Sequence, residues 1–213
     1  MRVMKRSHRF YIYALCIVLL DQLLKLFVYF NLHQGEEVIL LGNFKLHYTL
    51  NPGMAFGFEF GATYGKFLLT FFRLVIILGV GIYLYKLIQR NAHKGLIWSL
   101  ILIFAGGMGN LIDSIFYGAF LNVATYDAVT PWFHGQVIDM LFIDVGPIAL
   151  PNWVPKFGGH NVSAPIFNIA DISAFIGIIM VVILHRRFFT ADAPVASSTP
   201  QTNEISQQPE QAS

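Results

Sequence analysis

The chain has few charged residues and almost no cysteine. Charged side chains make up 12% of its 213 residues, whereas soluble domains contain roughly 25%. Cys16 is the only cysteine, which excludes a disulfide framework and a cysteine-based metal site. A net charge of +2 is too small to suggest a nucleic-acid partner. Because 55% of the residues are hydrophobic, the composition indicates a membrane protein.

Four apolar segments are long enough to cross a bilayer, which takes about 20 helical residues. They are residues 10–30, 66–88, 95–115 and 166–184. The first follows a basic stretch, but its apolar run is too long for a signal peptide and no cleavage site follows it. We therefore expect an all-α membrane protein with four transmembrane helices, formed by residues 1–189 as one domain.

Basic residues concentrate in the segments that would share one side of such a four-helix protein. They precede the first span, lie between the second and third, and follow the fourth. Since short cytoplasmic loops carry the excess of Lys and Arg, we expect both termini to be cytoplasmic and both long loops to lie outside. Residues 190–213 lack aromatic side chains, and we expect a disordered cytoplasmic tail there.

The two outer loops contain patterns of their own. Residues 44–50 alternate as in a strand, and residues 38–40 could pair with them, which predicts a small extracytoplasmic β-sheet. The turn Asn51-Pro52-Gly53 either reverses a hairpin or presents backbone groups to an extended peptide. The loop between the third and fourth helices is long, and we expect it to form an extended flap or platform at the membrane surface, with Trp132 and Phe133 among the lipid headgroups.

Three carboxylates from separate parts of the chain are predicted to meet at the outer end of the helices. Asp113 ends the third helix, Asp139 lies in an apolar outer segment, and Asp171 lies five residues into the fourth predicted helix. An ionised carboxylate at membrane depth is costly. Two carboxylates in one low-dielectric site share a proton, because both cannot ionise readily. Such a pair supplies a base for water and an acid for the leaving group.

Other polar residues are expected at the same level. Asp21 and Lys25 lie four residues apart on the first helix and form either a structural ion pair or a contact with substrate. Asn168 precedes Asp171 by three residues and can cap the helix or bind a ligand. The sequence contains neither G-x-S-x-G nor H-E-x-x-H. The outer histidines are scattered, so we expect no metal and no cofactor; they are His33, His47, His134 and His160.

Five sequence blocks, taken in order, resemble the lipoprotein signal peptidase (signal peptidase II) family of bacterial membrane aspartic peptidases. They are DQLLK, NPGMAFG, GGMGNLID, GQVIDML and FNIADIS, and the resemblance extends to about residue 184. It implies that Asp139 and Asp171 are the catalytic dyad. It also implies a set of residues that support or line the site: Asp21, Lys25, Asn51, Gly53, Asn110, Asp113 and Asn168. Of these, Asp113 is expected to buttress the third helix.

The resemblance also implies a substrate and a location. The substrate is a diacylglyceryl-modified prolipoprotein, cleaved just before its lipidated cysteine. The enzyme is expected in the bacterial cytoplasmic (inner) membrane, as a monomer in contact with lipid, with its active site at the outer face. The alternative is an intramembrane proton- or cation-coupled transporter, which needs acids spread through the membrane depth. No internal repeat favours that alternative.

The chain departs from the family pattern at one position close to these motifs. The family usually has Arg directly after the Asp of the GNLID block, and this chain has Ser114 there. A cation near the substrate or the dyad is therefore missing, and either Arg73 or Lys156 would have to replace it.

Overall fold

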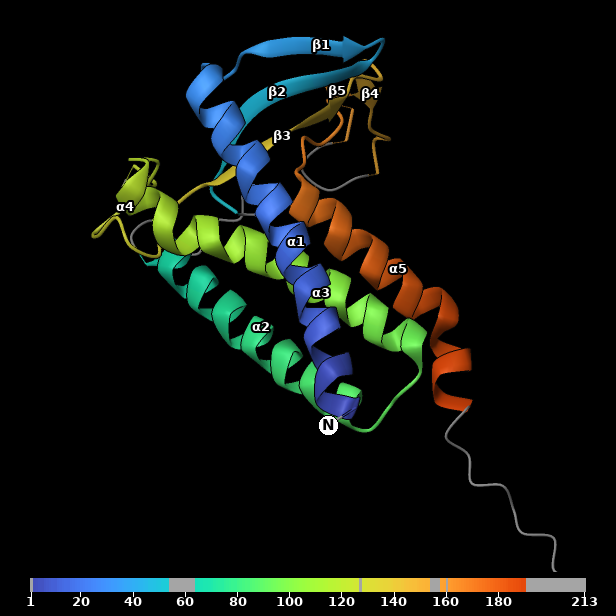
Figure 1. Cartoon of the computed structure of the whole chain (residues 1–213). Helices are drawn as coiled ribbons and strands as arrows, with labels where there is room; N and C mark the ends of the chain where they lie inside the picture. Colours follow the sequence, from blue (N-terminus) through green and yellow to red (C-terminus); the bar gives the residue numbers. More distant parts are fainter. Residues whose placement is uncertain (1, 54–63, 127, 154–157, 160, 191–213) are drawn as a thin grey trace, which may run out of the picture.

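The computed structural model describes residues 2–53, 64–126, 128–153, 158–159 and 161–190 (Figure 1). Its long helices are α1 (Arg2–Asn31), α2 (Gly65–Gln89), α3 (Lys94–Ile112) and α5 (Ile169–Thr190). Helix α3 continues through a π-helical turn, η2 (Asp113–Tyr117), into the short helix α4 (Gly118–Phe120). The predicted tail beyond residue 190 and Lys156 lie outside the described residues.

Three described helices are long and apolar enough to cross a membrane: Arg9–Asn31, Gly65–Gln89 and Lys94–Phe120. They correspond to the first three predicted spans, and the third is longer than predicted. The described apolar part of α5, Ile169–Ile183, is shorter, so the fourth span stays a prediction. The predicted start of this helix at residue 166 is wrong. Phe167 instead exchanges backbone hydrogen bonds with Leu141, and the helix begins at Ile169.

Helix α3 occupies the centre of the helical part, where it packs against α1, α2 and α5 (Figure 1). Its contact with α5 is close because small residues face each other. A Cβ atom added to Gly106 would lie 2.2 Å from the Ala170 carbonyl oxygen and 2.8 Å from the Ala174 nitrogen. Backbones that touch in this way are typical of helix pairs in membranes. The contact holds the first turn of α5 against α3.

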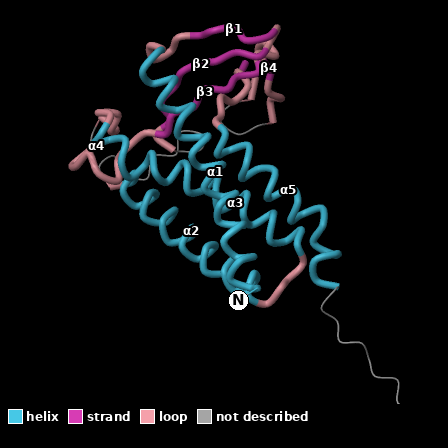
Figure 2. The backbone as a smooth tube through the Cα atoms, viewed as in Figure 1, coloured by secondary structure: helices cyan, strands magenta, loops and turns pink. Residues whose placement is uncertain are grey.

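The strands form a small sheet at the end of the helices far from the N-terminus (Figure 2). Its antiparallel order is β1 (Glu37–Leu41), β2 (Phe44–Asn51) and β3 (Val137–Ile143). A separate pair joins β4 (Ile148–Ala149) to β5 (Asn161–Val162). The two predicted strands of the first outer loop are thus confirmed. The third strand was expected only as an apolar outer segment.

Strand β3 joins the sheet to the helices. Six of its seven residues are buried, and Ile138, Met140 and Leu141 belong to a core with Val28 of α1 and Tyr117 of η2. In the sheet, Thr49 pairs with Asp139 and Asn51 pairs with Val137. A polar side chain in this strand is therefore held between β2 and the ends of α1, α3 and α5.

Candidate active site

Two carboxylates, from β3 and from the first turn of α5, meet on either side of Asn168. The Asn168 side-chain Nδ2 donates to Asp139 Oδ1 at 2.7 Å. The Asn168 backbone N–H donates to Asp171 Oδ2 at 3.1 Å, and the Asp171 N–H donates back to Asn168 Oδ1 at 2.9 Å. This reciprocal pair is a capping box, which satisfies N–H groups that the helix start leaves free. One residue thus caps α5 and holds both carboxylates.

The position of Asp171 differs from the predicted one. It is the third residue of α5, in the first turn, rather than about five residues into a helix that begins earlier. A carboxylate is favoured there because the N-terminal end of a helix carries partial positive charge. The helix end therefore accounts for part of the tolerance of Asp171 at this depth.

Asparagine amides also bind the remaining carboxylate oxygens. Asn51, the last residue of β2, donates from Nδ2 to Asp139 Oδ2 at 2.9 Å. Asn110 of α3 donates from Nδ2 to Asp171 Oδ1 at 2.7 Å and accepts at Oδ1 from Asn168 Nδ2 at 3.0 Å. The structure thus brings Asn51, Asn110 and Asn168 together around both carboxylates, as the motifs predicted.

The surroundings make Asp139 able to exchange a proton near neutral pH. Its side chain is only 2% exposed, and this burial raises its pKa to about 7. The charge of Asp171 acts in the same direction, while the hydrogen bonds from Asn51 and Asn168 lower the pKa. Burial dominates because it penalises the ionised form of a carboxyl group.

A buried ion-pair cluster supports the site from α1. Lys25 Nζ lies 2.7 Å from Asp21 Oδ2, 2.7 Å from Asp113 Oδ2 and 3.0 Å from Asn110 Oδ1. These contacts match the three donors of an ammonium group. Asp21 Oδ1 also accepts from the Ala170 N–H at 2.9 Å. Asp21 and Lys25 are at most 1% exposed, which favours a structural ion pair over a contact with substrate.

Two further residues complete this cluster, and the sequence did not identify them. Gln22 Nε2 donates to Asp113 Oδ1 at 2.9 Å and to Asp21 Oδ2 at 3.2 Å. The Tyr117 hydroxyl donates to Gln22 Oε1 at 2.9 Å. The available signal was an amide directly beside Asp21 in an otherwise apolar helix. Asp113 thus joins η2 to α1. Its side-chain contacts are with this cluster rather than with Asp139 and Asp171, beside which the sequence placed it.

A cation from α2 lies beside Ser114. Arg73 Nη1 donates to Ser114 Oγ at 3.3 Å, and Nη2 donates to the Gly53 carbonyl oxygen at 3.1 Å. Of the two residues suggested as replacements for the missing Arg, Arg73 therefore lies at the position in question. Gly53 has φ +83°, and its N–H donates to Asn51 Oδ1 at 2.7 Å.

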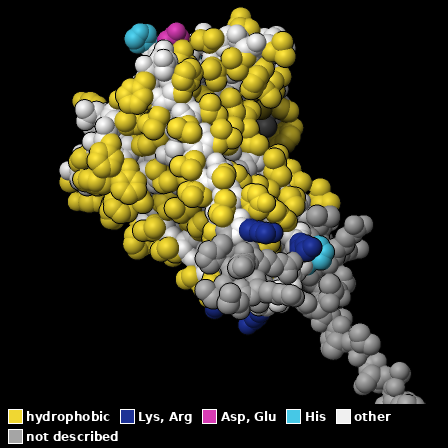
Figure 3. Space-filling view, in the orientation of Figure 1, with side chains coloured by type: hydrophobic (Ala, Val, Ile, Leu, Met, Phe, Trp, Pro, Cys, Tyr) yellow, Lys and Arg dark blue, Asp and Glu magenta, His cyan; other side chains and the backbone are white. Residues whose placement is uncertain are grey.

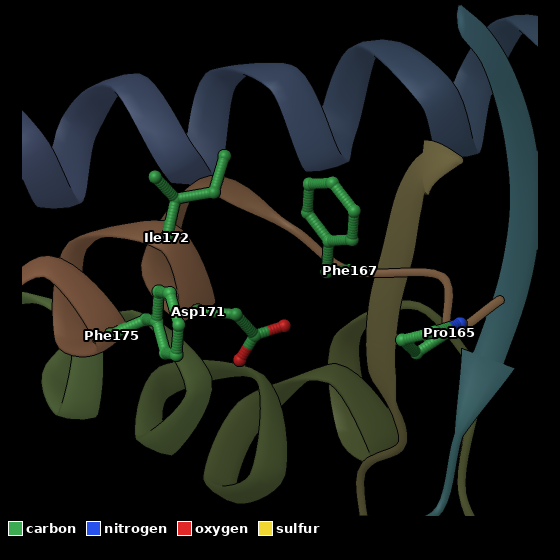
Figure 4. A pocket seen from close by; sticks show the side chains of 5 residues that line it. All are labelled: Pro165, Phe167, Asp171, Ile172 and Phe175. Carbon is green, nitrogen blue, oxygen red and sulfur yellow. The ribbon is translucent and has the colours of Figure 1, made fainter. Parts of the chain in front are cut away.

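A pocket of about 470 Å³ opens beside Asp171. Its other lining residues are apolar: Pro165, Phe167, Ile172 and Phe175. In Figure 4 the Asp171 carboxylate points into the space between Phe175 on one side and Phe167 and Pro165 on the other. An apolar group bound in this pocket would place its neighbouring bond beside the Asp171 carboxylate. Within the described ranges, no group of three His, Cys, Asp or Glu residues is arranged to hold a metal ion.

Comparisons with known proteins agree with the motifs. A family profile described as Signal peptidase (SPase) II matches residues 13–187. The lipoprotein signal peptidase of Amoebophilus asiaticus is 48% identical over 187 residues, which cover 85% of this chain and 79% of that protein. The lipoprotein signal peptidase of Porphyromonas gingivalis is 36% identical over 189 residues, which cover 82% of each chain.

Solved structures show a related fold. One bacterial membrane enzyme superposes with a TM-score of 0.58 at 21% identity, covering 88% of this chain and 93% of the other. A second gives a TM-score of 0.56 at 22% identity, covering 84% of this chain and 92% of the other. At these identities the likeness concerns the fold alone.

Proposed function

Because the chain belongs to the signal peptidase II family and is a lipoprotein signal peptidase of the aspartic type, we propose that Asp139 and Asp171 are its catalytic pair. The observation that carries the proposal is their placement on either side of Asn168, with Asp171 lining an apolar pocket. The transporter alternative is not supported by these findings.

The proposed reaction needs one proton on the pair. The ionised carboxylate takes a proton from water as the water oxygen attacks the scissile carbonyl carbon. The protonated carboxyl gives its proton to the carbonyl oxygen, which forms a neutral tetrahedral intermediate. When the C–N bond breaks, the carboxyl that took the water proton gives it to the leaving nitrogen. The other carboxylate takes the proton of a hydroxyl as the carbonyl re-forms, which restores the singly protonated pair. A carboxyl whose pKa lies near 7 suits this exchange, because it can both take and give a proton at neutral pH.

We propose a diacylglyceryl-modified prolipoprotein as the substrate and the bond before the lipidated cysteine as the point of cleavage. The acyl chains of such a substrate stay in the bilayer, so this bond lies at the membrane surface. The pocket lined by Phe167, Ile172 and Phe175 offers an apolar surface for the groups flanking that bond. Burial of apolar area gives about 25 cal/mol per Å², which favours lipid-modified over unmodified precursors.

The proposed setting is the bacterial inner membrane, with four spans, both termini cytoplasmic and the carboxylate pair at the outer face. Hydrophobic side chains cover most of the face in Figure 3, and its Lys and Arg side chains lie at the end away from the sheet. That distribution supports a cytoplasmic position for this end. We propose that the protein acts as a monomer.

A gel-shift assay in detergent tests the substrate directly. Purified protein is incubated with one prolipoprotein in two forms, diacylglyceryl-modified and unlipidated, and the loss of the signal peptide is followed. We expect cleavage of the modified form and little or none of the unlipidated form. Equal cleavage of both forms would contradict the proposed specificity. Failure of the folded protein to cleave either form would contradict the proposed function.

A further inference from the structure

Arg73 lies in a polar stripe on α2, a helix whose other residues are mostly apolar. The stripe consists of Lys66, Thr70 and Arg73, which are spaced three and four residues apart and share one face of α2. Lys66 is 2% exposed and Thr70 is 0% exposed, so this face is turned toward the protein. Arg73 is eight residues after the start of α2, about 12 Å along the helix. A cation this far along a transmembrane helix costs free energy unless polar or charged partners compensate it, so such residues commonly mark functional sites.

The Nη2 atom of the Arg73 guanidinium is linked to Asp139 through two intervening residues. This atom donates to the Gly53 carbonyl oxygen, and the Gly53 N–H donates to Asn51 Oδ1. That second bond determines which way the Asn51 amide points, so its Nδ2 is left to donate to Asp139 Oδ2. Removing the guanidinium would free the turn that orients Asn51.

The Nη1 atom of the guanidinium is linked to Asp171, also through two intervening residues. Arg73 Nη1 donates to Ser114 Oγ, and this hydroxyl donates to the Asn110 carbonyl oxygen at 2.9 Å. Asn110 in turn donates from its side chain to Asp171 Oδ1. Arg73 therefore bridges the two chain segments that supply Asn51 and Asn110, each of which holds one member of the carboxylate pair.

The charge of Arg73 also balances the buried cluster. Lys25 lies between Asp21 and Asp113, which leaves one negative charge. Arg73 adds one positive charge, which offsets it. Lys66 Nζ has no hydrogen-bond partner within the described part of the chain.

The carboxylates whose charges act on Arg73 are Asp171, Asp139 and Asp113. The His134 ring lies beside Phe67 of α2, with ring centroids 6.2 Å apart and tilted by 31°. The three carboxylates reach Arg73 from η2, β3 and α5, so its positive charge lies between the ion-pair cluster and the catalytic pair.

We propose that Arg73 is a positioning residue of this peptidase, which takes the place of the Arg that the family pattern has at position 114 and holds both catalytic carboxylates through Gly53 and Ser114. The proposal rests on the proposed function. It assigns a role to a residue on a different helix from the one that carries the family motif.

The test moves the guanidinium from one helix to the other. We compare Arg73→Ala, Ser114→Arg and the double variant with wild type, using the diacylglyceryl-modified prolipoprotein in detergent. A misplaced catalytic group can cost about 100-fold in rate, so we expect Arg73→Ala to lower kcat by about that factor with KM changed less than about threefold. Ser114→Arg alone should also lose activity, because two guanidinium groups would occupy one buried space. The double variant should recover at least about tenfold in kcat over Arg73→Ala.

Two conservative variants separate charge from geometry. Arg73→Gln removes the positive charge, so it should move the alkaline limb of the pH–rate profile upward by about one pH unit. Arg73→Lys keeps the charge, so it should lower kcat and leave that limb in place. These variants also replace Arg73→Ala in the test if the alanine variant does not fold. The matched control is Lys86→Ala, a cation in the last turn of the same helix, which should retain wild-type kcat and pH profile.

A second route disturbs the same contact from the opposite side. A Cβ atom added to Gly53 would lie 2.9 Å from Arg73 Nη1, whereas one added to Gly35 would meet nothing within 4 Å. Both glycines have φ near +84°, so Gly53→Ala and Gly35→Ala carry the same backbone strain. We expect only Gly53→Ala to lower kcat.

Wild-type kcat and pH profile in Arg73→Ala and Arg73→Gln would overturn the role of Arg73, and so would a double variant no better than Arg73→Ala. Wild type is measured alongside the variants. If wild type cleaves and the Arg73 variants cleave equally well, only this inference is refuted. Absence of cleavage by folded wild type refutes the proposed function itself.

Discussion

Neutral amides, rather than cations, make the direct contacts to the carboxylate pair. Asn51, Asn110 and Asn168 donate to Asp139 and Asp171 from three different segments. Lys25 stays one residue further away and is shared by two other carboxylates. A cation in direct contact would favour full ionisation of both groups. Amide donors orient the carboxylates and still allow one proton to remain on the pair.

The titration of Asp139 predicts the pH dependence of cleavage. Burial raises its pKa to about 7, so the singly protonated pair is present below that pH and loses its proton above it. We expect kcat/KM to fall as the pH rises through about 7. Asn51→Ala removes a hydrogen bond that lowers this pKa, so the alkaline limb should move to higher pH and kcat should fall.

The control for this series is Asn31→Ala, because Asn31 binds only the Phe27 carbonyl at the exposed end of α1 in the described contacts. Its pH–rate profile should match wild type. A profile that stays level through pH 7 to 9, or an alkaline limb that moves downward in Asn51→Ala, would contradict the assignment of the proton to this pair.

Among the elements, the contact between α3 and α5 determines where Asp171 lies. Gly106 allows the two backbones to touch at the turn that bears Asp171, and Gly109 lies where a Cβ atom would come 2.6 Å from Asp21 Oδ2. No side chain larger than hydrogen fits at either position without moving α5 or α1. The geometry of the site therefore depends directly on how closely these helices pack.

We expect Gly106→Ala to lower the stability and the activity together. Overpacking of this kind costs about 1–3 kcal/mol, which lowers Tm by roughly 2–10 °C in a protein of this size. Gly79→Ala is the matched control, because a Cβ atom at Gly79 of α2 meets nothing within 4 Å. Thermal unfolding in detergent should give Gly79→Ala an equal or higher Tm, since Ala favours a helix over Gly. Equal Tm values for Gly106→Ala and wild type would contradict this prediction, because α3 and α5 could then move apart without loss of stability.

How well the sequence predicts a helix or strand depends on whether lipid or other parts of the protein cover it. Hydropathy located α2 and the apolar part of α1, Arg9–Asn31, closely, because every apolar residue of such a helix contributes to the signal. It missed the start of α1 at Arg2, which lies in the basic stretch. It placed the start of α5 too early, since Ile166 and Phe167 continue the apolar run although Phe167 pairs with β3. Strand β3 is buried along six of its seven residues, so it lacks the alternation that identifies a strand.

The same limit applies to the site. The ordered motifs predicted that Asp139, Asp171 and their asparagines belong together, and the structure brings them together. The sequence offered Arg73 and Lys156 as replacements for the missing Arg, but it could not show that Arg73 reaches Ser114 from 41 residues away. Neither composition nor spacing records which helices become neighbours in space.

At the scale of the whole molecule, the proposed topology places the carboxylate pair and the basic loops at opposite ends. It is tested by single cysteines in a Cys16→Ala background. Asn43→Cys lies in the turn between β1 and β2, Gln89→Cys ends α2, and Ser213→Cys is the last residue. A membrane-impermeant maleimide should label Asn43→Cys in intact spheroplasts, and the other two only after lysis. Labelling of Ser213→Cys before lysis would contradict an even number of spans.

The central claim is that two carboxylates perform the cleavage, and single-turnover kinetics of Asp139→Asn and Asp171→Asn test it most directly. Each variant is incubated in excess over diacylglyceryl-modified prolipoprotein, and binding of the substrate is measured separately. Loss of an acid or base group costs about 10²–10⁴-fold in rate. We therefore predict a fall of at least that size in both variants, with binding changed less than about threefold. Cleavage at the wild-type rate by either folded variant would contradict the claim.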